Sequence, residues 1–369
     1  MPMGKSKKEM VYIILTGFIV GIISALLTLL GNPKNMGFCI ACFLRDTAGG
    51  IGLHNAEAVR YIRPEITGIV TGALAAAVIN KEFAPKGGSS PMTRFALGAM
   101  VMIGCLMFLG CPLRMMIRLA GGDLNALFGL LGFIPGILTG IFFLNRGYSL
   151  KKNTRLSYAE GGILPVCAVA LLIIAAVRPS FMTFTEDGAG PGGMHASIAV
   201  SLAAGLIVGV LAQRTRLCFV GGIRDFMLFR DKKLLWGFAA VFAGCFIMNL
   251  VLTAFTQTAY FNPGLYNEPI AHTDMLWNFL GMYLAGFGCV LLGGCPLRHL
   301  VLSGEGNTDS AVTVLGLMAG AAISHNFKLA SSAEGPTQNG RIAVIICIVL
   351  TALIAFLNSA QSKKAPASK

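Results

Sequence analysis

Long uncharged apolar segments recur along the whole chain, separated by short polar connections. A membrane helix needs roughly 20 apolar residues, and by this criterion we count ten candidates, several of them short. Within each segment the apolar residues are continuous and do not alternate with polar ones, which indicates helices. The segments are residues 10–30, 66–80, 95–113, 124–145, 161–177, 196–213, 234–258, 275–297, 310–325 and 342–358. The pattern predicts an all-α polytopic membrane protein with some short broken or re-entrant helices.

Composition and charge support this assignment and indicate an orientation. Hydrophobic residues make up 55% of the chain and charged residues only 12%, although the net charge is +13. The basic residues lie in the connections, as the positive-inside rule predicts, so nucleic acid is not an expected partner. We expect a multi-pass protein of the cell (inner) membrane with both termini in the cytoplasm. Residues 179–195 and 262–274, which contain no Lys or Arg, are then outside.

Some basic residues do not fit this orientation. Seven of them fall on the outside, against the rule: Arg45, Arg60, Arg63, Arg114, Arg118, Lys328 and Arg341. A functional use of Arg45 and Arg114, or re-entrant segments, explains part of this misfit.

Two motifs occur once in each half of the chain. Cys39 begins a Cys-x5-Arg-Asp motif that recurs at Cys218. A Gly-Cys pair followed by Cys-Pro-Leu-Arg ends at Arg114 and recurs ending at Arg298. Each half holds an odd number of candidate helices, five, so the second copy enters the membrane from the opposite side. The sequence therefore predicts two inverted-topology repeats, an architecture in which transporters bind substrate near the midplane, between the halves.

The Cys-Pro-Leu-Arg motif favours an anion site at the start of a short helix. The residue before a proline leaves the helical conformation, and proline suits the first helical position, so Cys111 and Cys295 are expected N-caps. The positive helix end attracts anions, and an arginine lies one turn further on. A soft thiol beside a cation suits thiosulfate or a selenium analogue. The candidate substrate-binding residues are Cys39, Cys111, Cys218, Cys295, Arg45, Arg114, Arg224 and Arg298.

Other cysteines have simpler interpretations. Three lie within apolar segments and have no repeat partner: Cys167, Cys245 and Cys347. A packing role is favoured for these three. Cys105 and Cys289 recur in both halves, but six residues of unbroken helix turn them away from Cys111 and Cys295. Packing is therefore favoured for them as well.

Two rival functions stay open. Cys39-x2-Cys42 and the even count of ten cysteines fit a membrane thiol-disulfide or sulfur/selenium-transfer enzyme. Gly221 stands where the second copy would carry the counterpart of Cys42, so a dithiol is not part of the repeated design. Four thiolates would also complete a metal site, but the flanking arginines repel a cation. We expect a transporter that is not an enzyme and that has no cofactor and no metal.

These paired motifs resemble those of the YeeE/YedE family of membrane proteins, over residues 10–358. The resemblance implies a thiosulfate-type transporter in which cysteines of both halves, here Cys39, Cys111, Cys218 and Cys295, line a central constriction. The Pro-Leu-Arg after the later cysteine resembles the family branch associated with selenium metabolism. The expected partners are a small sulfur or selenium oxyanion, the lipid bilayer and a cytoplasmic sulfur/selenium carrier protein.

The predicted organisation follows the repeat. The first inverted repeat covers residues 10–178 and the second covers residues 196–358, while residues 1–9 and 359–369 form cytoplasmic tails.

Overall fold

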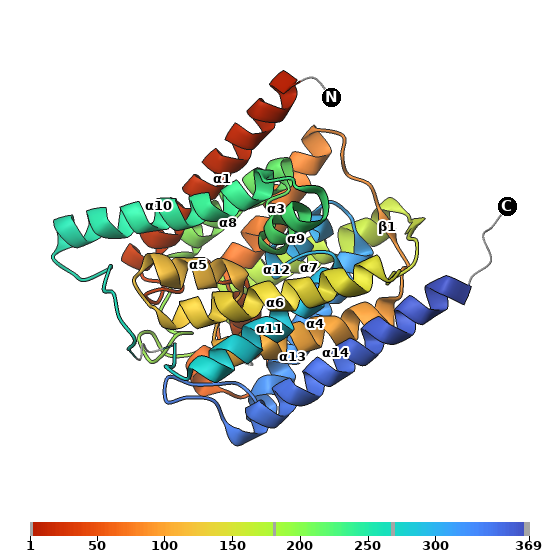
Figure 1. The fold of residues 1–369 in the computed structure, drawn as a ribbon. Coiled ribbons are helices and arrows are strands. Elements are labelled where there is room, and N and C mark those ends of the chain that lie inside the picture. The colour runs from red at the N-terminus through yellow and green to blue at the C-terminus, as the bar shows by residue number, and fades with distance from the viewer. Residues whose placement is uncertain (1–2, 180–181, 267–269, 365–369) are drawn as a thin grey trace.

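The computed structural model describes residues 3–179, 182–266 and 270–364, and these residues are mostly helical (Figure 1). The first half contains α1 (Met3–Leu29), α2 (Ile40–Gly50), the 3-10 helix η1 (Glu57–Val59), α3 (Pro64–Ile79), β1 (Lys86–Gly87), α4 (Pro91–Phe108), α5 (Pro112–Ala120), α6 (Asn125–Asn145), β2 (Thr154–Arg155) and α7 (Tyr158–Val177). The second half contains α8 (Ile198–Thr215), α9 (Phe219–Phe229), α10 (Lys233–Thr256), α11 (Met275–Leu292), α12 (Pro296–Gly304), α13 (Thr308–Asn326) and α14 (Gln338–Lys364). β1 and β2 pair antiparallel.

The helices confirm an all-α polytopic membrane protein. Among the described residues, nine helical segments are long and apolar enough to cross a membrane. The protein itself covers them unequally: 83% of an apolar 18-residue stretch within Pro91–Ala120 is buried, but only 22% of such a stretch within α7. α4 and α5 are therefore central, while α7 faces outward. α1 begins at Met3, within the predicted tail 1–9, and α14 continues to Lys364, within the predicted tail 359–369; residues 1–2 and 365–369 lie outside the described chain.

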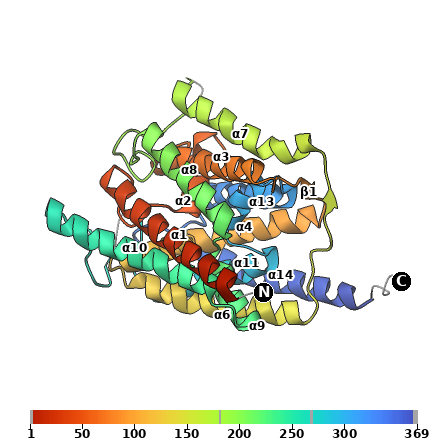
Figure 2. The same cartoon turned by 90° about the horizontal axis from the view of Figure 1, so that it is seen from above.

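Helices of the two halves pack against each other in a reciprocal pattern. α1 packs along α10 and α3 along α8, while α4 packs against α13 and α6 against α11 (Figure 2). α4 and α11 also cross each other. The crossing is close because a Cβ on Gly104 would lie 2.6 Å from the carbonyl oxygen of Gly281. The halves are thus interleaved, and the centre of the molecule belongs to both.

Short helices start at all four matched cysteines. The predicted N-caps are confirmed, since Cys111 directly precedes α5 and Cys295 directly precedes α12. The apolar segments did not predict α2 and α9, which follow Cys39 and Cys218 as N-caps. Each cysteine therefore stands at the positive end of a helix, beside free backbone N–H groups.

Four of the misplaced basic residues are inside the protein. Arg45, Arg63, Arg114 and Arg118 are at most 2% exposed, so they do not belong to outside loops. Arg118 pairs with the buried Asp123 at 2.6 Å. These residues break the charge rule because they are part of the buried polar interior of the molecule, where the rule does not apply.

Candidate functional site

The starts of α2 and α5 meet and bring three thiols together. Cys39 Sγ accepts a hydrogen bond from the backbone N–H of Cys42 at 3.3 Å and lies 2.8 Å from Cys42 Sγ. The Cys111 thiol interacts with the Cys39 thiol and with the backbone of Ala41. All three cysteines are free and at most 1% exposed. We call Cys39, Cys42, Cys111 and the adjacent Arg114 the first cysteine cluster.

Arg114 supplies this cluster with a positive charge. Its Nη1 donates to Cys42 Sγ at 3.3 Å and to the Leu109 carbonyl, and its Nε and Nη2 donate at 3.0 Å to the carbonyls of Asn35 and Ile270. No carboxylate contacts Arg114 in the described part of the chain. A buried guanidinium held only by carbonyls and a thiol keeps its charge uncompensated, so it attracts an anion.

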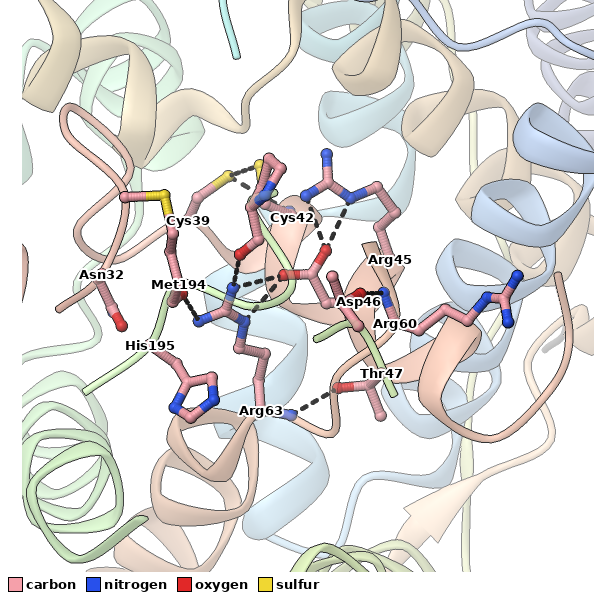
Figure 3. A network of polar contacts seen from close by, with 12 residues as sticks. Asn32, Cys39, Cys42, Arg45, Asp46, Thr47, Arg60, Arg63, Met194 and His195 are labelled. Atoms are coloured by element: carbon pink, nitrogen blue, oxygen red, sulfur yellow. Dashed lines mark hydrogen bonds and ion pairs between the residues drawn. The ribbon is translucent and has the colours of Figure 1, made fainter. Parts of the chain in front are cut away.

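Arg45, the other predicted arginine of the first half, belongs to a buried ion-pair network (Figure 3). Asp46 accepts from Arg45 Nη2 at 2.7 Å and from Arg63 Nε at 2.8 Å. Arg63 also donates to the carbonyls of Pro191 and Met194, in the connection between α7 and α8. Arg45 therefore has an acidic partner. Through Arg63, the network also holds the connection between the two halves against the start of α3.

The starts of α9 and α12 form a second thiol pair. Cys218 Sγ accepts from the backbone N–H of Gly221 at 3.3 Å. The thiols of Cys218 and Cys295 interact with each other, and each also meets backbone groups at the helix starts. We call Cys218, Cys295 and the adjacent Arg224 the second cysteine cluster.

The predicted arginines of the second half both have acidic partners. Arg224 Nε donates to Asp225 at 2.8 Å, while its Nη1 reaches the carbonyl of Gly293 at 3.3 Å. Arg298 Nη1 lies 3.2 Å from Glu305. A cavity of about 950 Å³ opens where α1, α8, α9 and α10 meet, and Asp225 lines it. Solvent thus comes close to the second cluster.

Cys105 and Cys289 lie between the two clusters. Cys105 is close enough to Cys39 and to Cys289 to interact electrostatically with both, and Cys289 in turn interacts with Cys218. Both are buried. The sequence argument for packing assumed an unbroken helix, whereas α4 and α11 end just after these cysteines. Their recurrence in both halves was the signal that could have singled them out.

The remaining cysteines separate into one near the site and three away from it. Cys42 was left out of the candidate residues, although its spacing from the N-cap Cys39 puts it one turn along the same helix. Cys245 is buried beside Asn249, and Cys347 belongs to a separate apolar cluster. Cys167 is exposed on α7 and does not pack inside the protein.

The sequence is similar to one described protein family and to two curated proteins. Residues 214–365 match the model of the family described as Sulphur transport. The chain is 27% identical over 130 residues to the thiosulfate transporter TsuA of Escherichia coli K12, which covers 35% of each chain. It is 34% identical over 114 residues to the thiosulfate transporter TsuA of Spirochaeta thermophila, covering 31% of this chain and 32% of the relative.

These alignments span about a third of the length of the two curated relatives. They agree with the resemblance that the duplicated motifs predict, and the family match includes Cys218, Cys289 and Cys295. Residues 214–365, less than half of the chain, are thus similar to the Sulphur transport family, in agreement with the predicted resemblance to the YeeE/YedE family of membrane proteins.

Proposed function

We propose that this protein carries a small sulfur-containing anion across a membrane, with thiosulfate or a selenium analogue as substrate. One observation carries the proposal: two buried thiol clusters stand at the starts of short helices, each beside an arginine, inside a polytopic membrane protein. The Sulphur transport match and the two relatives named as thiosulfate transporters support the substrate class.

The anion passes along the buried thiols without forming a covalent bond. Its oxygens accept hydrogen bonds from Arg114 and from backbone N–H groups at the helix starts, which are strong because the acceptor is charged. Its soft terminal chalcogen contacts the sulfur atoms. Cys105 and Cys289 provide intermediate contacts between the two clusters.

The two halves act as inverted repeats around this path. The reciprocal packing of α1 with α10 and of α3 with α8 supports that relation. The ion pairs Lys233–Glu9 and Arg214–Glu82 join neighbouring ends of these helices. The connections there also carry Arg216, Arg230 and Lys232, and this excess of basic residues supports our assignment of this face to the cytoplasm. The cavity beside Asp225 then opens to the cytoplasm, and a reporter fused at Asp187 reads outside.

Uptake of labelled thiosulfate into proteoliposomes tests the proposal, with selenite and selenosulfate as competitors. Cys111→Ser and Cys295→Ser each reduce uptake strongly, because a hydroxyl is a hard partner for a soft chalcogen. Cys347→Ser, a buried cysteine outside both clusters, is the matched control. Normal uptake by both cluster variants, or no uptake by the unmodified protein, contradicts the proposal.

The thiol-disulfide alternative keeps one specific observation in its favour. Cys39 Sγ and Cys42 Sγ are only 2.8 Å apart. If the protein is such an enzyme, Cys39→Ser and Cys42→Ser abolish activity equally, and activity follows the redox state of a thiol partner. Transport that is unchanged between reducing and mildly oxidising conditions excludes it.

A further inference from the structure

Glu65, in the first turn of α3, is a buried carboxyl group without a basic partner. Its Oε1 accepts hydrogen bonds from Asn32 Nδ2 and Ser201 Oγ, both at 3.1 Å. Its Oε2 is buried and has no hydrogen-bond partner in the described chain, and its side chain is 0% exposed. Removing an unpaired carboxylate from water is costly, and ionisable residues within membrane segments typically serve proton or ion pathways.

The neighbouring charges do not neutralise Glu65. Arg63, two residues earlier, is directed to Asp46 and to backbone carbonyls. α2 contributes Arg45 and Asp46, which pair with each other. α8 approaches with Ser201 and with Gly205, whose Cβ would lie 2.5 Å from the Glu65 carbonyl oxygen. Arg178 at the end of α7 lies over the Phe184 ring.

A series of polar groups links Glu65 to the surface. The Asp187 side chain is 79% exposed and lies 3.6 Å from His195 Nε2. His195 stacks on Tyr61 at 4.0 Å between ring centroids, and the buried Tyr61 hydroxyl has no hydrogen-bond partner among the residues that the structure describes. The next residue, Ala196, donates its N–H to Asn32 Oδ1, and Asn32 contacts Glu65. Figure 3 shows Asn32 and His195 beside Arg63.

Glu65 has no counterpart in the second half. In the reciprocal packing α10 corresponds to α3, and α10 contains no acidic residue. Glu65 is therefore not part of the duplicated thiol design. Its contacts join α3 to α8 of the other half, and to the chain just after α1, so any change in these hydrogen bonds changes an interface between the halves.

We propose that Glu65 binds one proton in each transport cycle and so couples anion transport to a proton gradient; this inference rests on the proposed transport function. The proton comes from the aqueous phase beside Asp187 and His195 and adds to the Glu65 carboxylate. Water carries it over the last step, because the Ala196 and Asn32 amides do not relay protons. It returns to water on the opposite side after the contact between α3 and α8 rearranges. No covalent bond other than the O–H bond forms or breaks.

Thiosulfate counterflow and gradient-driven uptake, measured on the same proteoliposomes, separate coupling from transport. In the unmodified protein, acid outside accelerates uptake, and a pH electrode records external alkalinisation when thiosulfate is added. Glu65→Gln keeps counterflow but loses both the acceleration and the alkalinisation, because the amide cannot take up a proton. Glu82→Gln, at an exposed carboxylate just after the same helix, is the matched control. A hydrogen bond from Gln213 lowers the pKa of Glu82, so this group stays ionised.

Each outcome decides between defined alternatives. No counterflow in the unmodified protein contradicts the proposed function itself. Three outcomes overturn the proton site: counterflow in the unmodified protein without pH stimulation of uptake, stimulation of uptake by a sodium gradient alone, or full pH stimulation of uptake in Glu65→Gln. If Glu65→Gln fails to reconstitute, Ser201→Ala and His195→Gln take its place. Both then retain counterflow and show reduced pH stimulation, and unchanged stimulation in both overturns the inference.

Discussion

The two cysteine clusters share a sequence motif but differ in what surrounds their arginines. In the first, Arg114 is fully buried, and within the described ranges its hydrogen bonds go only to carbonyls and Cys42. In the second, Arg224 is paired with Asp225 and its side chain is 25% exposed. Arg298, the repeat counterpart of Arg114 just outside the second cluster, is paired with Glu305 and its side chain is 14% exposed. The repeated motif thus places an arginine in each half, but the neighbours decide whether its charge is available. We infer that the first cluster holds the anion more tightly, and that the second, beside the cavity, releases it.

The largest expected effect comes from removing the uncompensated charge. Arg114→Gln should lower thiosulfate uptake about 10- to 100-fold, because a hydrogen bond from a charged donor contributes roughly 1.5–3 kcal/mol. Arg298→Gln should change uptake only a few-fold, since Glu305 already neutralises this arginine. Initial rates over a range of thiosulfate concentrations measure both.

Arg114→Gln also removes hydrogen bonds to buried carbonyls, so folding must be checked separately. Arg114→Lys keeps the charge and is the matched control, and thermal melting in detergent reports the stability of all three variants. Equal losses of uptake in Arg114→Gln and Arg298→Gln, at unchanged stability, would refute the difference between the clusters.

The second-largest expected effect concerns Cys42, which is present in the first cluster only, because Gly221 occupies the matching position of the second half. Cys42→Ser should reduce uptake about three- to tenfold through the weakened contacts to Arg114 and Cys39, given a net 0.5–1.5 kcal/mol for a typical hydrogen bond. Cys245→Ser, at a buried cysteine outside the clusters, should leave uptake unchanged. Unaltered uptake in Cys42→Ser would instead restrict the path to the repeat-matched thiols.

Thiol labelling tests the difference in access. A small maleimide should modify Cys218, which is 5% exposed near the cavity, faster than Cys39, which is 0% exposed. The experiment uses a Cys167→Ala background, since Cys167 is exposed on α7, and mass spectrometry to locate the label. Thiosulfate should protect both sites, and faster labelling of Cys39 would reverse the assignment of the open side.

The smallest effect concerns the helix break. α4 ends at Leu109 with a φ of 60°, whereas α11 ends at Gly293 with a φ of 89°. Left-handed backbone costs a residue with a side chain roughly 1–2 kcal/mol. Leu109 is buried, and loss of a buried leucine side chain costs roughly 2–5 kcal/mol, so Leu109→Gly should destabilise the protein by about 1–3 kcal/mol. Thermal melting measures this, and Gly293→Leu should destabilise by a similar amount. A higher melting temperature for Leu109→Gly would mean that backbone strain outweighs the packing of Leu109.

Local rules predicted much of the fold and part of the site. The apolar segments gave most of the long helices, and the Cys-Pro pairs gave the breaks before α5 and α12, because both signals act within a few residues. The sequence did not predict Cys105 and Cys289 as site residues, because their position depends on how α4 and α11 cross. Counting charges placed Arg63 and Arg118 outside, because a sequence does not reveal which connections fold back into the protein.

The connection between α7 and α8 has a consequence for how such a protein can evolve. Two carbonyls of this segment bind Arg63, and its final residues lead to Asn32, so it is part of the interior of the first half. If the gene were divided there into two subunits, these contacts would form only on association, at an added entropic cost. The contacts of this connection therefore favour keeping the two halves in a single chain.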